Sequence, residues 1–280
     1  MESYRNQSAT LNASWVVYGT HDGVSKDDPA EFFHEASALY PTQLTRQLPG
    51  MVFVETSPQL RLTASRSTKR HSHVESIALP PSDLPATSFA DLIARRRTTG
   101  NLGTGPLDLR RIATLLRSSY GVTGRIKLSH GGEQSFRAAP SAGALYPLDI
   151  YPVVFAADDL AAGIYHYDPL RDVLELLRLG DTRAALLEAL PMKQLAERCP
   201  VAFVITATFW RSRFKYGQRG YRFALLEAGH LAQNVLLAAE ALELAAAPIG
   251  GFYDRQLSEY LEIDGVNEGP LYVIPIGSKP

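Results

Sequence analysis

Two stretches of sequence decide how this chain folds: APSAGALYPLDIY at residues 139–151 and KYGQRGYRFALLEAGHLAQN at residues 215–234. From residue 221 to residue 244, apolar residues recur at spacings of three and four, which predicts a long helix that is apolar on most sides. Such a helix is expected to run through the core or a subunit interface. The apolar run at 148–156 is rich in β-branched and aromatic residues and predicts a strand.

The regions on either side supply further elements. The residue patterns predict helices at 89–97, 108–119 and 183–190, and strands at 163–167, 173–177, 201–209 and 271–276. Because the strands arrive in a run, with helices before and after them, the order favours an α+β fold over a doubly wound sheet.

Residues 59–88 differ in character from the rest of the chain. A Ser-rich, basic stretch leads into Pro80, Pro81 and Pro85, and proline removes a backbone donor and disfavours helix at the residue before it. We therefore expect no regular element here and place a domain boundary at its end. The predicted organisation is an N-terminal extension, residues 1–88, that ends in a Ser- and Pro-rich loop, followed by one domain, residues 89–280.

Composition narrows the class of protein. The 280 residues carry 28 Lys and Arg against 29 Asp and Glu, a formal charge of -1, so the chain has no overall attraction for nucleic acid or anionic membranes. Its single cysteine, Cys199, rules out an intramolecular disulfide and thiolate metal clusters, and the histidines lack the spacing of a zinc site. No metal is expected, and redox chemistry would need an organic cofactor. The first residues lack a secretory signal pattern, so we expect a cytoplasmic protein.

Three short segments have the chemistry of a binding site. Arg-Arg-Thr at 96–98 suits a phosphate monoester, because guanidinium groups beside a hydroxyl give charge-assisted hydrogen bonds, although a solvated charge run is the simpler explanation. Ser-Ala-Gly at 141–143 lets backbone N–H groups approach a planar or anionic ligand, but a tight connection between elements would use the same residues. Pro-Ile-Gly-Gly at 248–251 permits close approach to a flat ring, and helix termination alone would also explain it.

Ionisable residues gather before and along the predicted long helix. Lys215 and Tyr216 form a pair in a loop before it, where the ammonium favours the phenolate and eases proton abstraction. Glu227, His230 and Asn234 come next at spacings of three and four on one face. Each group has a plain structural alternative, which is surface loop residues for the pair and buried hydrogen bonding for the helix face.

Taken in order, four stretches resemble the SagB-type dehydrogenases, also called McbC-like oxidoreductases, a branch of the FMN-dependent nitroreductase family. They are Arg-Arg-Thr at 96–98, APSAGALYPLDIY at 139–151, GIYHYDP at 163–169 and the stretch at 215–234. The resemblance covers about residues 89–280. It implies an α+β, nitroreductase-like fold with a central, mainly antiparallel sheet flanked by helices. It also implies an FMN enzyme that is usually a homodimer with two flavin sites built from both subunits.

The resemblance further implies roles for single residues. The matching cofactor-binding positions are Arg96, Arg97, Thr98 and Lys279 at the FMN phosphate, Ser141, Ala142 and Gly143 along the flavin and ribityl chain, and Pro248, Ile249, Gly250 and Gly251 beside the flavin ring. Lys215 and Tyr216 match the pair associated with catalysis in members that oxidise azolines. The chain departs from the family at Gly100, where a second basic residue often follows the phosphate motif, so phosphate affinity is expected to rest on the arginines and Lys279.

The function expected from this resemblance is FMN-dependent oxidation of a thiazoline or oxazoline to the azole on a peptide or carrier-bound natural-product intermediate. The expected partners are a second copy of the chain and a cyclodehydratase or other biosynthetic protein. Two alternatives stay open. One is an NAD(P)H-dependent nitro or quinone reductase, or a small-metabolite oxidase, on the same fold. The other is a non-catalytic scaffold without FMN, which a colourless protein that cannot be reconstituted would indicate.

Overall fold

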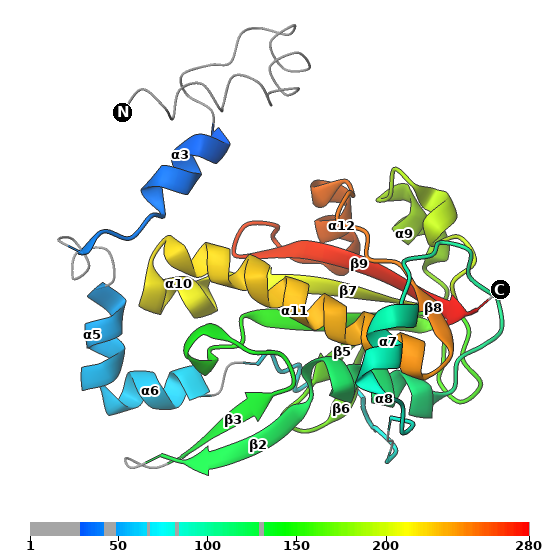
Figure 1. Ribbon diagram of the computed structural model, residues 1–280, viewed down its shortest axis with the longest axis horizontal. Helices are drawn as coiled ribbons and strands as arrows, with labels where there is room; N and C mark the ends of the chain where they lie inside the picture. The colour runs from blue at the N-terminus through cyan, green and yellow to red at the C-terminus, as the bar shows by residue number, and fades with distance from the viewer. Residues whose placement is uncertain (1–28, 42–48, 66–67, 82–83, 129–131, 280) are drawn as a thin grey trace, which may run out of the picture. The chain divides into compact units, whose positions relative to one another are not determined.

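The computed structural model describes residues 29–41, 49–65, 68–81, 84–128 and 132–279. The chain forms two compact units, Met1–Leu44 and Thr45–Pro280. The described helix of the first unit is α3 (Pro29–Ala36), which has no buried residue. The remaining described elements belong to the second unit, and most of them are labelled in Figure 1. Every helix among the described residues is too short or too polar to cross a lipid bilayer.

The second unit is built on a seven-stranded sheet with the strand order β1-β6-β5-β4-β7-β9-β8. Its strands are β1 (Ser76–Ala78), β4 (Leu148–Val154), β5 (Gly163–Asp168), β6 (Val173–Leu179), β7 (Val201–Thr208), β8 (Leu244–Ala246) and β9 (Glu268–Ser278). Neighbouring strands all pair antiparallel. A separate hairpin joins β2 (Val122–Lys127) to β3 (Glu133–Arg137). The predicted α+β fold with an antiparallel central sheet is confirmed.

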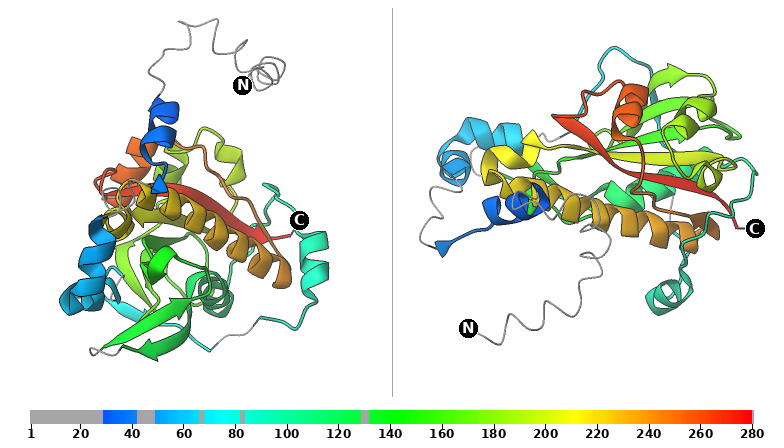
Figure 2. Two further views of the ribbon diagram at one scale, coloured as in Figure 1. Left: turned by 60° about the vertical axis from the view of Figure 1, so that its left-hand side comes forward. Right: turned by 90° about the horizontal axis from the view of Figure 1, so that it is seen from above.

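Helices cover both faces of this sheet, as Figure 2 shows from two further directions. The helices of this unit are α5 (Pro49–Thr56), α6 (Pro58–Ser65), α7 (Phe89–Arg95), α8 (Leu109–Tyr120), α9 (Arg183–Glu188), α10 (Trp210–Tyr216), α11 (Arg219–Ala241) and α12 (Asp254–Leu261), with short 3-10 turns η2 (Ala142–Ala144) and η3 (Lys193–Leu195). Residues of α8 and α11 share one core cluster with the sheet, and residues of α9 and α12 share the other.

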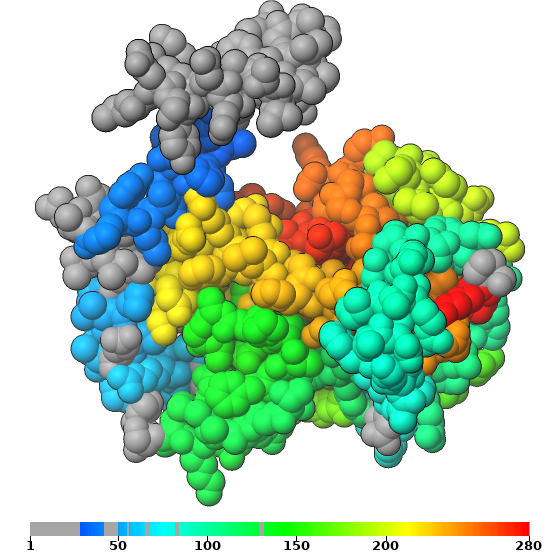
Figure 3. Space-filling view, in the orientation of Figure 1, coloured from blue at the N-terminus to red at the C-terminus, as the bar shows by residue number. Residues whose placement is uncertain are grey.

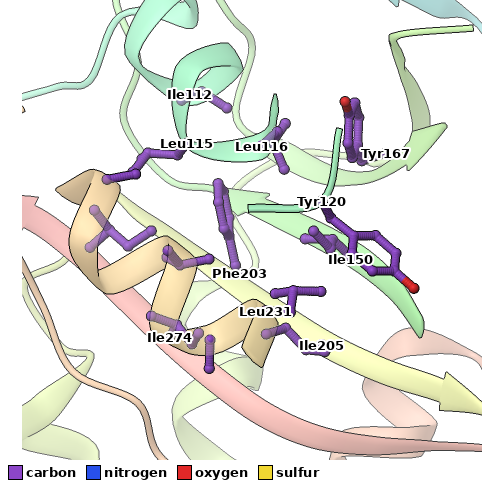
Figure 4. Packing of buried hydrophobic residues seen from close by; sticks show 14 of the residues in the cluster. Ile112, Leu115, Leu116, Tyr120, Ile150, Tyr167, Phe203, Ile205, Leu231 and Ile274 are labelled. Atoms are coloured by element: carbon purple, nitrogen blue, oxygen red, sulfur yellow. The ribbon is translucent and has the colours of Figure 1, made fainter. Parts of the chain in front are cut away.

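The position of the central strand β7 explains why its sequence is almost continuously apolar. Phe203 and Ile205 join the cluster under α8 and α11, where they pack near Leu231 (Figure 4). Their neighbours Ala202 and Val204 join the cluster on the opposite face. Because both faces are covered, the side chains from Val201 to Ala207 are buried, and an apolar run without alternation results.

The predicted long helix is α11, which begins and ends slightly earlier than the pattern at 221–244 indicates. Its buried side includes Ala224, Leu231 and Val235. On the other side, Leu225 and Leu226 are 43% and 61% exposed. In Figure 3, α11 crosses the surface of the second unit as a yellow to orange band. The helix is apolar on most sides because it packs on the sheet and also presents leucines to the surface.

The prediction that residues 59–88 hold no regular element is wrong. The helix α6 covers Pro58–Ser65, and Ser76–Ala78 form β1, which pairs with the edge of β6. Pro80, Pro81 and Pro85 all come after β1, so they interrupt neither element, and Pro58 takes the first helical position, where a missing N–H is tolerated. The sheet therefore includes residues before Phe89, and the boundary at residue 88 stays a prediction.

Candidate functional site

The connection from β3 to β4, which we call the 141–146 loop, contains a group of left-handed residues. Gly143, Ala144 and Tyr146 have φ values of 63°, 52° and 45°. This conformation costs a non-glycine residue roughly 1–2 kcal/mol, so the surrounding contacts have to enforce it. The helical part of this loop is the single 3-10 turn η2, with Ser141 at its N-cap. Strain of this kind is concentrated at functional sites.

Lys215 and Tyr216 reach this loop from α10. They are its last two residues, so the prediction that they lie in a loop is wrong; a seven-residue helix is too short to give a clear periodic signal. A Cβ on Gly143 would lie 2.4 Å from the Tyr216 hydroxyl oxygen and 3.3 Å from Lys215 Nζ. Lys215 Nζ lies 5.3 Å from the centroid of the Tyr216 ring. The structure thus brings two groups of predicted site residues together, with a glycine at their contact.

A carboxyl group from α11 lies close to the same loop. Glu227 is 2% exposed, and its Oε1 accepts a hydrogen bond of 2.6 Å from the Tyr120 hydroxyl. Its Oε2 has no hydrogen-bond partner among the described residues. The Ser141 hydroxyl lowers the pKa of the carboxyl group, although the two groups do not reach normal hydrogen-bond geometry. Burial raises the pKa of Glu227 to about 7, against the opposing effects of Ser141, Tyr120 and Arg137.

The other residues predicted on this helix face have different surroundings. Asn234 donates a 3.3 Å hydrogen bond to the Ser119 carbonyl oxygen, which fits the structural explanation. His230 is exposed. Of the three, Glu227 alone has its side chain buried beside the loop.

The candidate phosphate residues come directly after α7. Arg97 Nη1 donates to the carbonyl oxygens of Ala94 and Arg96, at 2.9 and 2.8 Å. Arg96 Nη1 donates to Thr98 Oγ1 at 3.4 Å. Neither guanidinium forms an ion pair within the part of the chain that the structure describes. Both charges are therefore available to an anion.

Lys279 is placed differently from these arginines. Its Nζ donates to Glu240 Oε1 at 3.0 Å and to Glu243 Oε2 at 2.9 Å. Arg95 approaches the same two carboxylates, at 3.6 and 3.9 Å. The Lys279 charge is thus already shared by two acidic groups at the end of α11.

The segment 248–251 lies near the residues that follow α7. Ile249 pairs with Val273 of β9 through backbone hydrogen bonds of 2.8 and 3.0 Å. Gly250 and Gly251 are exposed, and a Cβ on Gly251 would meet no atom within 4 Å. The Thr99 N–H donates to the Ala246 carbonyl oxygen at 3.5 Å, which brings the segment after α7 close to the one after β8.

The predicted site residues therefore form two groups along α11. The candidate catalytic residues surround the 141–146 loop near Glu227, and the candidate phosphate-binding residues lie near Glu240. The 13 residues from Glu227 to Glu240 correspond to about 20 Å of helix.

Sequence reasoning missed a polar cluster inside the sheet. His71, His166 and Glu175 have ligand atoms within 4.8 Å of one another, although no spacing in the sequence indicates this. His166 Nδ1 lies 2.9 Å from Glu175 Oε2, and its Nε2 lies 3.3 Å from Asp149 Oδ1. Burial alone would lower the pKa of His166, but its hydrogen bonds to the two carboxylates raise it.

Cations complete this cluster. Arg211 donates to Asp149 at 2.8 Å, and Arg171 contacts Glu175. Both carboxylates thus already have cationic partners, which makes the cluster a buried ion network joining β4, β5 and β6. The available signal was the presence of charged residues, Asp149 and Glu175, in largely apolar strands.

Comparison with known proteins agrees with this fold. The model of the family described as Nitroreductase family matches residues 93–278. The chain belongs to the nitroreductase family. Members of this family bind flavin, and the chain is a nitroreductase-family oxidoreductase.

Three relatives of this nitroreductase-family chain differ in how much they share with it. MJ1384, a nitroreductase-like protein of Methanocaldococcus jannaschii, is 34% identical over 203 residues, which is 72% of this chain and 96% of MJ1384. The microcin B17-processing protein McbC of Escherichia coli is 32% identical over 143 residues, 49% of this chain and 52% of McbC. A solved structure of a nitroreductase-like protein from Anabaena variabilis superposes with a TM-score of 0.68 at 28% identity, covering 88% of this chain and 45% of that one.

Proposed function

We propose that this nitroreductase-family protein is a SagB-type dehydrogenase that uses FMN to oxidise a thiazoline or oxazoline to the azole on a peptide or carrier-bound intermediate. The observation that carries the proposal is the contact of Lys215 and Tyr216 with Gly143. It sets two groups capable of proton transfer against a loop of small residues suited to a flat cofactor. The likeness to McbC, a microcin B17-processing protein, supports a substrate of peptide origin and delivery by a biosynthetic partner.

The residues present fit FMN in charge and in shape. Arg96, Arg97 and Thr98 would hold the phosphate through guanidinium groups that no described carboxylate neutralises. Lys279 would add a third cation if the phosphate shares it with Glu240 and Glu243. When bound, FMN supplies the hydride acceptor.

Two backbone segments would lie against the flavin. Ser141, Ala142 and Gly143 would lie along the flavin and ribityl chain. Pro248, Ile249, Gly250 and Gly251 would face the ring, where the exposed glycines leave the backbone accessible.

The separation of these groups favours a site completed by a second copy of the chain. About 20 Å of helix lies between them. Apolar residues are exposed on both helices concerned, with Leu226 of α11 at 61%, and Phe89 and Ile93 of α7 at 69% and 50%. Exposed apolar surface of this kind is typical of a homodimer interface. We expect the phosphate residues of one protomer to face the 141–146 loop of its partner.

The chain's own contribution to the chemistry is proton removal. Aromatisation of an azoline ring takes one proton and one hydride from it. Lys215 or Tyr216 would accept the proton. Lys215 Nζ lies 5.3 Å from the centroid of the Tyr216 ring, so the two candidate bases lie side by side at the 141–146 loop.

Tyr216→Phe and Lys215→Ala test this role. General base catalysis contributes roughly 10²- to 10⁴-fold, so each variant should slow flavin reduction by an azoline substrate on that scale while keeping its FMN. The measurement is anaerobic single-turnover bleaching, which separates the reductive step from reoxidation. Tyr253→Phe, at a half-exposed tyrosine before α12, is the matched control and should react at the parent rate. Parent rates in both test variants would place the base elsewhere.

The relation to MJ1384 favours a second candidate, an NAD(P)H-dependent reductase, because that match covers nearly all of MJ1384. Steady-state NAD(P)H oxidation with a nitroaromatic or quinone acceptor tests it. Rapid turnover in this assay, together with no bleaching by azolines, would replace the dehydrogenase proposal.

A further inference from the structure

The 141–146 loop needs support from outside itself, because Ala144 and Tyr146 are left-handed without being glycine. Part of that support is local. The Tyr146 N–H donates to Ser141 Oγ at 2.8 Å, and the Tyr146 hydroxyl accepts from the Arg137 N–H at 2.9 Å. These bonds tie the loop to itself and to β3, but not to the helices below it.

Glu227 supplies a connection from α11 to both ends of the loop. Its Oε1 accepts from Tyr120 Oη at 2.6 Å, and the same hydroxyl accepts from the N–H of Leu148, the first residue of β4, at 3.3 Å. At the other end of the loop, the Ser141 hydroxyl lies close enough to the same carboxyl group to lower its pKa. One buried carboxyl group thus faces Ser141, which begins the loop, and Tyr120, which binds the first residue of β4.

Burial favours the neutral acid of Glu227, whereas the hydroxyl groups of Tyr120 and Ser141 favour the carboxylate. Its Oε2 is buried with no hydrogen-bond partner among the described residues, and a buried carboxylate oxygen without a donor is costly. A proton on Oε2 removes this cost, because it can be donated to Ser141 Oγ after a small shift. Three groups lower the pKa of this carboxyl group: Tyr120 from α8, Ser141 from the loop and Arg137 at the end of β3.

Arg137 is the one of these groups that favours the ionised form through its charge. Its guanidinium stacks over the rings of Tyr120 and Tyr146, with centroid distances of 4.5 and 4.6 Å. Burial outweighs its effect and raises the pKa of Glu227 to about 7.

We propose that Glu227 is a positioning residue which, as a neutral acid, links Tyr120 to Ser141 and so fixes the 141–146 loop against Lys215 and Tyr216. The consequence for flavin rests on the proposed function, whereas the support of the loop does not. The inference makes a chemical distinction that can be tested. Glutamine reproduces the neutral acid, since its carbonyl oxygen can accept from Tyr120 and its amide N–H can donate to Ser141. Leucine fills a similar volume and can do neither.

The experiment compares the full-length parent with Glu227→Gln and Glu227→Leu in two measurements. The first is amide hydrogen exchange without flavin, read on peptides that cover residues 139–147. We expect exchange at least 10-fold faster in Glu227→Leu and parent-like exchange in Glu227→Gln. The control Glu268→Leu also removes a buried carboxyl group, one bonded to Thr206 and Tyr151 instead, and should leave exchange in the loop unchanged.

The second measurement is FMN affinity by titration at pH 6 and pH 8. The parent should bind several-fold more weakly at pH 8, where the acid ionises, whereas Glu227→Gln should bind equally at both values. If Glu227→Leu does not fold, Tyr120→Phe removes the same link from the other side and should also speed exchange in the loop.

Two outcomes would overturn the proposal. Unchanged exchange in the loop of Glu227→Leu and Tyr120→Phe would show that the carboxyl group does not support it. A Glu227→Gln variant as impaired as Glu227→Leu would show that the carboxylate, paired with Arg137, is the working form. A parent chain that binds no FMN would reject the proposed function, while the exchange measurement still decides the role of Glu227.

Discussion

Gly143→Ala isolates the contact between the 141–146 loop and the proposed catalytic pair. The substitution has two effects that differ in kind. Gly143 has a φ of 63°, and a left-handed alanine costs roughly 1–2 kcal/mol of folding free energy. The new Cβ would also lie 2.4 Å from the Tyr216 hydroxyl oxygen, closer than the 3.0 Å below which a neighbour has to shift.

That shift should affect the rate more than the stability. The Tyr216 hydroxyl has to move by at least 0.6 Å to restore a 3.0 Å separation, and the Lys215 ammonium, at 3.3 Å, is crowded as well. Because a displacement of about 1 Å can cost on the order of 100-fold in rate, we expect flavin reduction by an azoline to slow on that scale. Urea unfolding measures the first effect, and anaerobic stopped-flow bleaching measures the second.

Gly180→Ala is the matched control for backbone strain. Gly180 has a φ of 110°, and a Cβ there would meet no atom within 4 Å. It should lose stability and keep the parent rate of flavin reduction. The reasoning about the Gly143 contact is refuted if Gly143→Ala behaves like this control.

The remaining predictions concern the candidate phosphate-binding residues, the proposed dimer interface and the dependence of stability on pH. Arg96→Ala combined with Arg97→Ala removes two charge-assisted contacts worth roughly 1.5–3 kcal/mol each, so FMN affinity in a dialysis or fluorescence titration should fall about 100-fold or more; unchanged flavin content rejects the assignment. Leu226→Asp places a charge on the exposed face of α11 and should shift light scattering from a dimer to the 30.7 kDa monomer; a parent chain that is itself a monomer with full FMN occupancy contradicts the shared site. Burial raises the pKa of Glu227 to about 7 from an ordinary value of 4.5, so the folded chain retains a proton that the unfolded chain releases. The free energy of unfolding of the parent should therefore fall relative to that of Glu227→Gln as pH rises from about 5 to 8, by at most about 3 kcal/mol; parallel urea curves across this range would contradict the raised pKa.

The parts of the fold that sequence predicts are those whose signal is local. The helix α8 and the strands β4 and β7 lie within a residue or two of their predicted positions, because their apolar patterns are long enough to specify one element. The three-residue strands β1 and β8 were missed, since each forms only by pairing with the edge of β6 or β9. Pairing of this kind depends on residues that lie far away in the sequence.

The candidate site divides in the same way. The residue types of Lys215 and Tyr216 indicated chemistry, but nothing local indicated that their side chains meet Gly143, which is distant in the sequence and lies on another element. Lys279 was matched to a phosphate role through its position alone, whereas its contacts with Glu240 and Glu243 arise from the way β9 passes the end of α11. Local patterns therefore identify candidate groups, and the topology of the sheet decides which of them meet.

The division of the candidate residues along α11 links cofactor binding to assembly. If FMN is held by the arginines of one protomer and the 141–146 loop of the other, it binds the dimer and not the monomer. Any ligand of this kind stabilises the state that binds it, so added FMN must tighten the dimer and dilution must release FMN. Arg96→Ala with Arg97→Ala should then abolish the tightening of the dimer by FMN, and Leu226→Asp should weaken FMN binding although it leaves the proposed flavin-binding residues unchanged. In a chain whose site is complete within one protomer, the first change would affect flavin alone and the second assembly alone, so measuring both properties on both variants decides between the two arrangements.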